Sequence, residues 1–223
     1  LAAHPEVDVD LEERLSSEII PAVAEGRAEV GLVADTVDIS GLETFQVATG
    51  LHPSDLVLSP DGGTLYVVNA NSDTVTVIDT HTKAVRETIL VRPSSTLPFG
   101  SSSTLPFGSQ TDGLALSADG TNLFVAVAGN NAIAVVELPN AQHANSVVQG
   151  FVPTDWYPGA VVADNDYIYV ANVKGLGTRY GQPKTKYNAT GNYLGTANRI
   201  PIPSAEALSK YSAQVNQNGR LRQ

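Results

Sequence analysis

The side chains that can do chemistry are scattered along this chain and form no catalytic motif. A zinc or two-metal hydrolase needs histidines and carboxylates grouped around the metal. The four histidines stand apart from one another, at His4, His52, His81 and His143. An isolated histidine is more often a turn or surface residue than a metal ligand. We therefore predict no metal site and no cofactor site in this chain.

Other patterns that resemble functional sites have simpler explanations. Asp164 and Asp166 carry oxygen atoms of the kind that Ca²⁺ prefers, but an Asp-Asn-Asp sequence between two strands is better explained as a hairpin turn. No glycine-rich loop follows a strand and opens a helix, so Gly175 and Gly177 do not form a phosphate-binding loop. Sequence alone does not exclude a Ser-His-Asp triad, but no nucleophile-elbow motif indicates one. We assign no catalytic residue.

Three residues are the first candidates for contact with a protein partner. Trp156 is the only tryptophan and precedes Tyr157. Lys174 follows the next predicted strand, so an aromatic anchor and a cation can share one surface, and such anchors often dominate interfaces. The alternative for Trp156 is packing between neighbouring units of the fold.

Two phenylalanines are further candidates. Phe99 and Phe107 occupy the same place in an octad that occurs twice, at 94–101 and 102–109. Its serine, proline and glycine break strands, and insertions into surface loops cost little stability. Either phenylalanine could anchor a binding loop, although a tolerated surface insertion is the preferred interpretation.

A repeat supplies the elements that position these residues. Residues 53–91 and 111–138 align without a gap, and a third copy begins at Tyr157. Each copy predicts short, alternating strands separated by tight turns. Asp61-Gly62 and Asp119-Gly120 provide the positive φ angles that a hairpin turn demands.

A fourth strand completes two of the copies, at 84–91 and 146–152. Four strands per unit with a period of about forty residues indicate a β-propeller. A β-sandwich also contains many short strands, but it would not repeat the same turn chemistry at the same places. A third copy begins but loses the pattern after Asn172.

The predicted fold is all-β, a partial propeller with about three to four four-stranded blades of a seven-bladed ring. Residues 1–26 form an acidic N-terminal segment. Residues 27–172 form the blades, with the duplicated octad in a loop at 94–109. Residues 173–223 form a basic, irregular tail with a short linker helix at 204–217, capped by Ser204. Residues 29–34 and 44–47 are predicted strands of a preceding blade.

The charge distribution excludes some partners. The chain carries 23 acids and 13 lysines and arginines, which argues against nucleic-acid binding. Residues 1–43 hold eleven of the acids, whereas the chain beyond Val173 holds eight bases and the single acid Glu206. That basic tail is either solvated or docks on an acidic partner.

The absence of cysteine excludes disulfides, thiolate metal sites and a cysteine nucleophile. It suits a compartment where free thiols are a liability, and we expect a secreted or periplasmic protein. No apolar run is long enough to span a membrane.

The strand motifs resemble those of a known family. Tyr66-Val67-Val68-Asn69 and Tyr169-Val170-Ala171-Asn172 look like the motif that names the YVTN β-propeller repeats. Segments 105–109, 150–158 and 174–177 are similar to a bacterial branch in which the propeller precedes an alkaline-phosphatase-like phosphoesterase domain. That domain, which would hold a divalent metal pair, has no counterpart here. Asp155 departs from the branch, because glycine is usual at its position.

These observations favour a non-catalytic binding or scaffold module of an exported protein or assembly. One alternative is the propeller portion of a metal-dependent phosphoesterase, as the resemblance implies. Another is a structural subunit of an extracellular filament or surface layer. An open arc of blades leaves blade faces exposed. We therefore expect a protein partner, further residues of the same polypeptide or another copy of the chain to complete the ring.

Overall fold

The computed structural model describes residues 44–92, 108–176 and 194–218, together with positions 19, 21, 23 and 25. The chain divides into two compact units, Leu1–Val47 and Ala48–Gln223. The prediction of a strand at 44–47 is wrong, because none of the described strands pairs with this segment and an unpaired strand leaves its backbone groups unsatisfied. The strand predicted at 29–34 lies outside the described residues.

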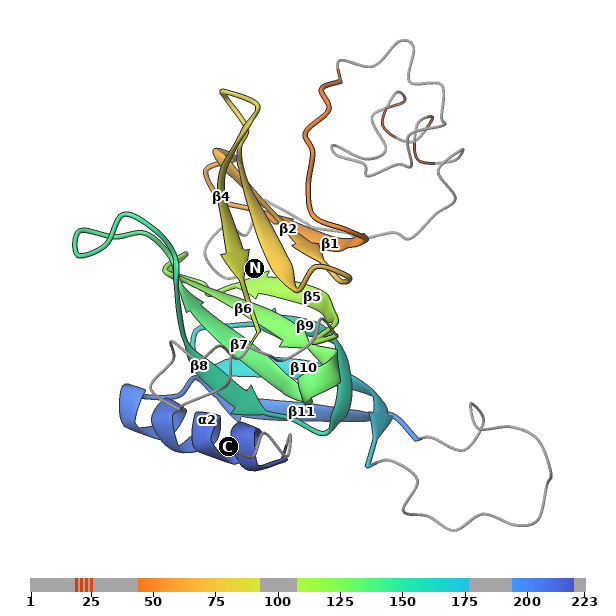
Figure 1. The fold of residues 1–223 in the computed structure, drawn as a ribbon, viewed down its shortest axis with the longest axis vertical. Coiled ribbons are helices and arrows are strands. Elements are labelled where there is room, and N and C mark those ends of the chain that lie inside the picture. The colour runs from red at the N-terminus through yellow and green to blue at the C-terminus, as the bar shows by residue number, and fades with distance from the viewer. Residues whose placement is uncertain are drawn as a thin grey trace, which may run out of the picture. The chain divides into compact units, whose positions relative to one another are not determined.

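The second unit contains three antiparallel sheets, each a propeller blade in which consecutive strands pair (Figure 1). Blade 1 consists of β1 (Pro53–Leu58), β2 (Thr64–Asn69), β3 (Thr74–Asp79) and β4 (Ala84–Leu90). Blade 2 consists of β5 (Thr111–Leu116), β6 (Asn122–Val127), β7 (Ala132–Glu137) and β8 (Val147–Pro153), with a 3-10 turn at Ala128–Asn130. Blade 3 consists of β9 (Trp156–Ala163), β10 (Tyr167–Gly175) and β11 (Thr196–Pro201). The first strands, β1, β5 and β9, lie next to one another. The predicted all-β, partial propeller fold is confirmed.

The hairpin turns explain why the first two strands pair in blade 1 and in blade 2. In blade 1, Asp61 accepts hydrogen bonds from the Ser59 hydroxyl and the Gly63 backbone N–H, and Gly62 has φ +72°. Asp119 and Gly120 repeat this arrangement in blade 2. The donated hydrogen bonds hold the pKa of both carboxyls below the ordinary value, with the serine hydroxyl the largest cause.

Blade 3 continues past Asn172, where the sequence pattern fades. Strand β10 runs on to Gly175, and β11 pairs with it from Asn172↔Thr196 to Tyr167↔Pro201. The third strand was missed because residues 176–195 separate β11 from β10, whereas four-residue turns separate β2 from β3 and β6 from β7 in the other blades. The described part of blade 3 therefore has three strands.

The hydrophobic core fills the two spaces between neighbouring blades. Between blades 1 and 2 the cluster includes Tyr66 and Val77 of blade 1 and Leu123 of blade 2. Between blades 2 and 3 it includes Phe124 and Ile168. Side chains on alternate positions of blade 2 enter one cluster or the other, because both faces of its sheet are covered.

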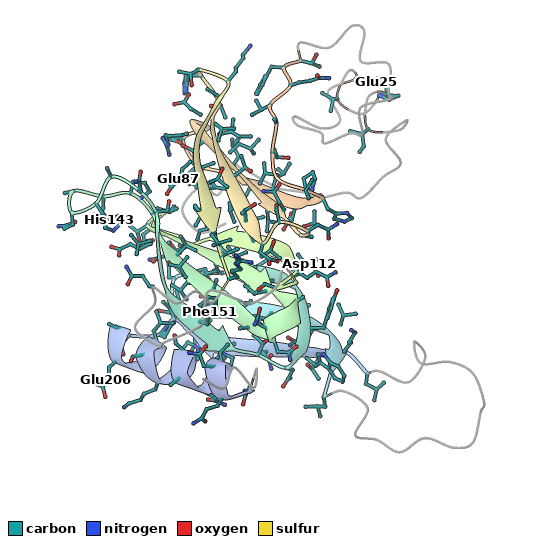
Figure 2. All side chains as sticks on the ribbon, viewed as in Figure 1. Glu25, Glu87, Asp112, His143, Phe151 and Glu206 are labelled. Atoms are coloured by element: carbon teal, nitrogen blue, oxygen red, sulfur yellow. The ribbon has the colours of Figure 1, made fainter. Side chains whose placement is uncertain are left out.

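Helix α2 (Ala205–Asn218) covers the free edge of β8, where Phe151 lies beside the helix (Figure 2). The Ser212 hydroxyl accepts a hydrogen bond from the Phe151 backbone N–H at 2.9 Å and donates one to the Leu208 carbonyl at 2.7 Å. A side chain at Gly150 would place its Cβ 2.5 Å from Ser212 Oγ, so the helix approaches β8 closely only because this residue is glycine. Ser204 caps the helix as expected, accepting from the Ala207 N–H at 3.3 Å.

Candidate functional site

The structure brings three of the five candidate partner residues together. Lys174 on β10 lies over two aromatic rings from the start of β9, with its Nζ 4.1 Å from the Tyr157 ring centroid and 5.5 Å from that of Trp156. Gly175 pairs with Trp156 in the sheet, which explains why residues distant in the sequence meet here. Trp156 is 39% exposed. An ammonium group over aromatic faces is a cation–π arrangement.

The backbone holds Tyr157 in a conformation that its side chain disfavours. Tyr157 has φ +66°, in the left-handed region where a bulky residue is uncommon. Its backbone N–H donates to the Asn131 side-chain oxygen at 2.9 Å. Asn131 belongs to blade 2 and also has positive φ, at +52°. A side chain of blade 2 therefore fixes the entry of the first strand of blade 3.

An equivalent contact joins blades 1 and 2. Asp73 has φ +55° and accepts the Gln110 backbone N–H at 2.9 Å and the Gly108 N–H at 3.1 Å. Gln110 in turn has φ +47° and precedes β5. Asp73 and Asn131 occupy equivalent positions, one residue before the third strand of their blades. We call these two links the blade latches.

Three residues at equivalent positions, where the adjacent strands β1, β5 and β9 begin, consequently share a left-handed backbone conformation. They are His52, Gln110 and Tyr157, and His52 has φ +57°. Glycine would adopt this conformation without steric cost. Each blade instead carries a side chain that can form hydrogen bonds at this position. Polar groups therefore gather where β1, β5 and β9 begin.

Asp112 joins this group from the second position of β5 (Figure 2). Burial raises the pKa of its carboxyl, and the nearby His52 partly counteracts the effect. Burial also raises the pKa of the Tyr157 phenol, and the negative charge of Asp112 adds to the rise. His52, Asp112 and Tyr157 thus come from three different blades and interact electrostatically at one place.

Sequence reasoning missed His52, Asp112 and Asn131. The positions of His52 and Asp112 in their copies of the repeat could have indicated that they face the same end of neighbouring strands. The Asn131 contact had no local sequence signal, because its partner lies in the next blade.

The other sequence-based candidates lie elsewhere. Phe99 and Phe107 fall outside the described residues, as does His4. His81 lies in the β3–β4 turn, and His143 hydrogen-bonds within its own loop to Asn145. Asp164 accepts the backbone N–H groups of residues 166 and 167, as a hairpin turn residue does. Within the described ranges no three His, Asp or Glu side chains are placed to hold a metal ion.

The arrangement offers recognition chemistry. Its members are an exposed indole, a phenol, an ammonium, a carboxyl and an imidazole at the ends of strands, and the latch from Asn131 holds the residue that carries the phenol, Tyr157. Aromatic side chains with a polar group are enriched where proteins contact other molecules. In the described part of the chain no helix is both long and apolar enough to cross a bilayer.

Repeated four-stranded blades with their first strands side by side define a β-propeller. The chain belongs to the lactonase, 7-bladed β-propeller family, whose model matches residues 32–175. No curated protein matches the chain.

Among solved structures, hydrazine synthase of Kuenenia stuttgartiensis is 24% identical, with a TM-score of 0.43 over 59% of this chain and 32% of that one. A putative 6-phosphogluconolactonase of Bacteroides fragilis is 19% identical, with a TM-score of 0.46 over 58% and 34%. A similar protein of Bacteroides uniformis is 20% identical, with a TM-score of 0.46 over 59% and 36%. The chain therefore spans about a third of the length of these structures.

Proposed function

We propose that this chain is a non-catalytic binding module of an exported propeller protein, and that Trp156, Tyr157 and Lys174 contact a protein partner. The observation that carries the proposal is the placement of the Lys174 ammonium over two aromatic rings at a surface where Trp156 is partly exposed. Tryptophan and tyrosine are enriched among residues that dominate interface energies. The latch at Asn131 supports the proposal, because it orders Tyr157 before any partner arrives.

Affinity capture tests this proposal. The intact protein is immobilised and exposed to the envelope fraction of its source organism. Trp156→Ala and Lys174→Met should each lose a partner that wild type retains. Val85→Ala is the matched control, because Val85 is 43% exposed on β4 in another blade. A partner retained equally by all four proteins would contradict the proposal.

Export is supported by the complete lack of cysteine in the chain. Cell fractionation with an antibody against the intact protein tests it. Recovery in the periplasm or medium is expected, and recovery only in the cytoplasm would contradict export.

The family match favours a second candidate function, the hydrolysis of a lactone by the whole protein. His52 directly precedes β1 and Asp112 is the second residue of the neighbouring strand β5, so these two acid–base groups are the candidates to activate a water molecule if this end of the strands holds a lactone. Titration of released acid with simple lactones tests this candidate, and His52→Ala and Asp112→Asn should both abolish the activity. Activity that survives both substitutions would assign hydrolysis to other residues.

The motifs similar to the YVTN branch favour the alternative that the parent protein is a phosphoesterase. An intact mass more than twice the 23.4 kDa of this chain, with phosphatase activity abolished by a chelator, would support it. An intact mass near that of the chain would support a separate binding module.

A further inference from the structure

Lys174 is the cation of the proposed partner site, and it forms no ion pair within the part of the chain that the structure describes. The ion pairs found there join other residues. Asp112 acts electrostatically on Tyr157 and is itself influenced by His52. The Lys174 ammonium lies over the rings of Tyr157 and Trp156. An aromatic face attracts a cation without neutralising it, so the ammonium keeps a charge that a ligand can pair with.

The position of Lys174 stays exposed in a blade that has neighbours on both sides. Lys174 follows the paired residue Asn172 by two positions, as Gly129 follows Val127 in blade 2. Gly129 is exposed although blades 1 and 3 flank blade 2. Asn71, the equivalent residue of blade 1, is also exposed, with blade 2 beside it. The accessibility of this position is therefore a property of the repeat and does not depend on which further blades complete the ring.

The positive charge at this position distinguishes blade 3 from the other two described blades, where Asn71 and Gly129 are neutral. The surrounding sequence has the same sign, because residues 167–205 contain five lysines and arginines and no acid. Residues 44–223 as a whole are close to balance, with twelve acids and eleven lysines and arginines. The excess of positive charge is thus concentrated in the stretch that contains Lys174, and such a concentration attracts anions.

The aromatic rings also raise the alternative of a cationic ligand. Lys174 already occupies the face of Tyr157, with its Nζ 4.1 Å from the ring centroid, so a second cation would meet a like charge there. An anion meets the opposite charge instead. The rings shield one side of the ammonium from water, and the attraction between opposite charges is stronger where water is excluded. Trp156 is 39% exposed and offers its indole to an apolar side chain beside the anion.

We propose that the partner contacted at this site presents an acidic segment, in which an aspartate or glutamate pairs with Lys174 and a neighbouring apolar side chain packs on Trp156. The inference rests on the proposed function and adds the chemistry of the partner to it. Two independent observations carry it. One is the accessible ammonium that has no carboxylate partner among the described residues, and the other is the positive stretch of sequence around it.

Selection of a random peptide library displayed on phage, with the intact protein immobilised, tests this chemistry. Wild type should enrich peptides that combine aspartate or glutamate with apolar residues, and Lys174→Met should not. The enriched peptide, synthesised with a fluorescent label, should bind wild type more weakly as salt rises. Lys174→Met should raise its dissociation constant by about fivefold, the effect of one surface ion pair, whereas Lys174→Arg should retain binding.

Matched controls separate this contact from general effects of charge. Lys210→Met removes an exposed cation from α2 and should leave both the selected sequences and the dissociation constant unchanged. Asparagine or glutamine in place of the peptide's acidic residues should weaken binding to wild type as much as Lys174→Met does. The same change in the peptide should have no further effect on Lys174→Met, because the pair is already lost. Far-ultraviolet circular dichroism confirms the fold of every variant.

The possible failures point to different parts of the argument. Selected peptides that lack acidic residues, but that Trp156→Ala fails to bind, would overturn the acidic chemistry and leave the partner site in place. Acidic peptides that bind Lys174→Met and Trp156→Ala as tightly as wild type would contradict both the acidic chemistry and the partner site. A wild-type protein that enriches no peptide would overturn the recognition of an acidic segment, while affinity capture would still test the partner site itself.

Discussion

The side-chain oxygen of Asn131 accepts the backbone N–H of Tyr157 at 2.9 Å, and this contact joins the second blade to the third. Both residues have positive φ. Asp73 and Gln110 repeat the relationship one blade earlier, also at 2.9 Å. The connection between the second and third blades therefore also fixes the backbone of Tyr157, a candidate binding residue.

Substitution of Asn131 measures how much this latch contributes to the free energy of unfolding. Asn131→Gly keeps the left-handed backbone but removes the acceptor, and we expect it to lower the free energy of unfolding by about 1–2 kcal/mol. Asn131→Asp keeps an acceptor and should stay close to wild type. Urea unfolding provides the measurement. Equal stability of the glycine variant and wild type would show that the latch adds nothing to the fold.

Asp155 has a similar role at the outer part of blade 3. Its carboxylate accepts hydrogen bonds from the Thr196 hydroxyl at 2.8 Å and the Asn198 amide at 3.0 Å, which ties β11 to the corner between β8 and β9. Asp155→Gly removes both hydrogen bonds. We expect a loss of about 1–3 kcal/mol in the free energy of unfolding, and a much smaller loss for Asp155→Asn.

Hydrogen exchange locates the effect of the Asp155 substitution. Exchange in β11 should accelerate in Asp155→Gly, while exchange in blade 1 should match wild type. Uniform acceleration throughout the three blades would contradict a local role.

A double-mutant cycle tests the contact between Lys174 and Tyr157. Lys174→Met keeps most of the side-chain length without the charge, and Tyr157→Leu keeps an apolar side chain without the aromatic face. Their coupling energy in urea unfolding should be about 0.5–1 kcal/mol, as for other cation–π pairs near a surface. A cycle between Lys174→Met and Tyr66→Leu, in a different blade, should give no coupling. Zero coupling in the first cycle would show that the contact between Lys174 and Tyr157 does not stabilise the fold.

Asp112 makes the stability of the fold depend on pH. Burial raises the pKa of its carboxyl above the ordinary value of 3.8, so the folded chain holds this proton more tightly than the unfolded chain. Ionisation of Asp112 therefore destabilises the fold as pH rises through the raised pKa, and below the ordinary pKa both states are protonated.

Asp112→Asn should consequently be more stable than wild type at neutral pH, and this advantage should vanish as pH falls below 3.8. Urea unfolding of both proteins at a series of pH values provides the measurement. A difference that stays constant with pH would contradict the assignment.

The fold could be predicted because its signals are local. Alternating strands and the Asp-Gly turns at 61–62 and 119–120 lie within a few residues of the hydrogen bonds they form. The meeting of Trp156, Tyr157 and Lys174 was also predictable, because both segments flank one hairpin of a recognised repeat. The predicted role of these residues in partner binding stays a prediction.

The remaining features depend on contacts between blades or across a long interruption. Asn131 was not identified because its partner, Tyr157, belongs to the next blade. His52 and Asp112 come from different copies of the repeat, so only the side-by-side placement of β1 and β5 brings them near each other. Strand β11 carries a weak alternating pattern and is separated from β10 by residues 176–195.

Photo-cross-linking at position 156 tests most directly whether Trp156, Tyr157 and Lys174 contact a protein partner. A photoreactive phenylalanine analogue replaces Trp156 in the intact protein within its native host, and the same analogue replaces Val85 in a matched control. The proposed partner site predicts a discrete cross-linked protein from position 156 that is absent from position 85 and lost when Lys174→Met is added. The same products from both positions, or none from position 156, would contradict a partner-binding role for Trp156, Tyr157 and Lys174.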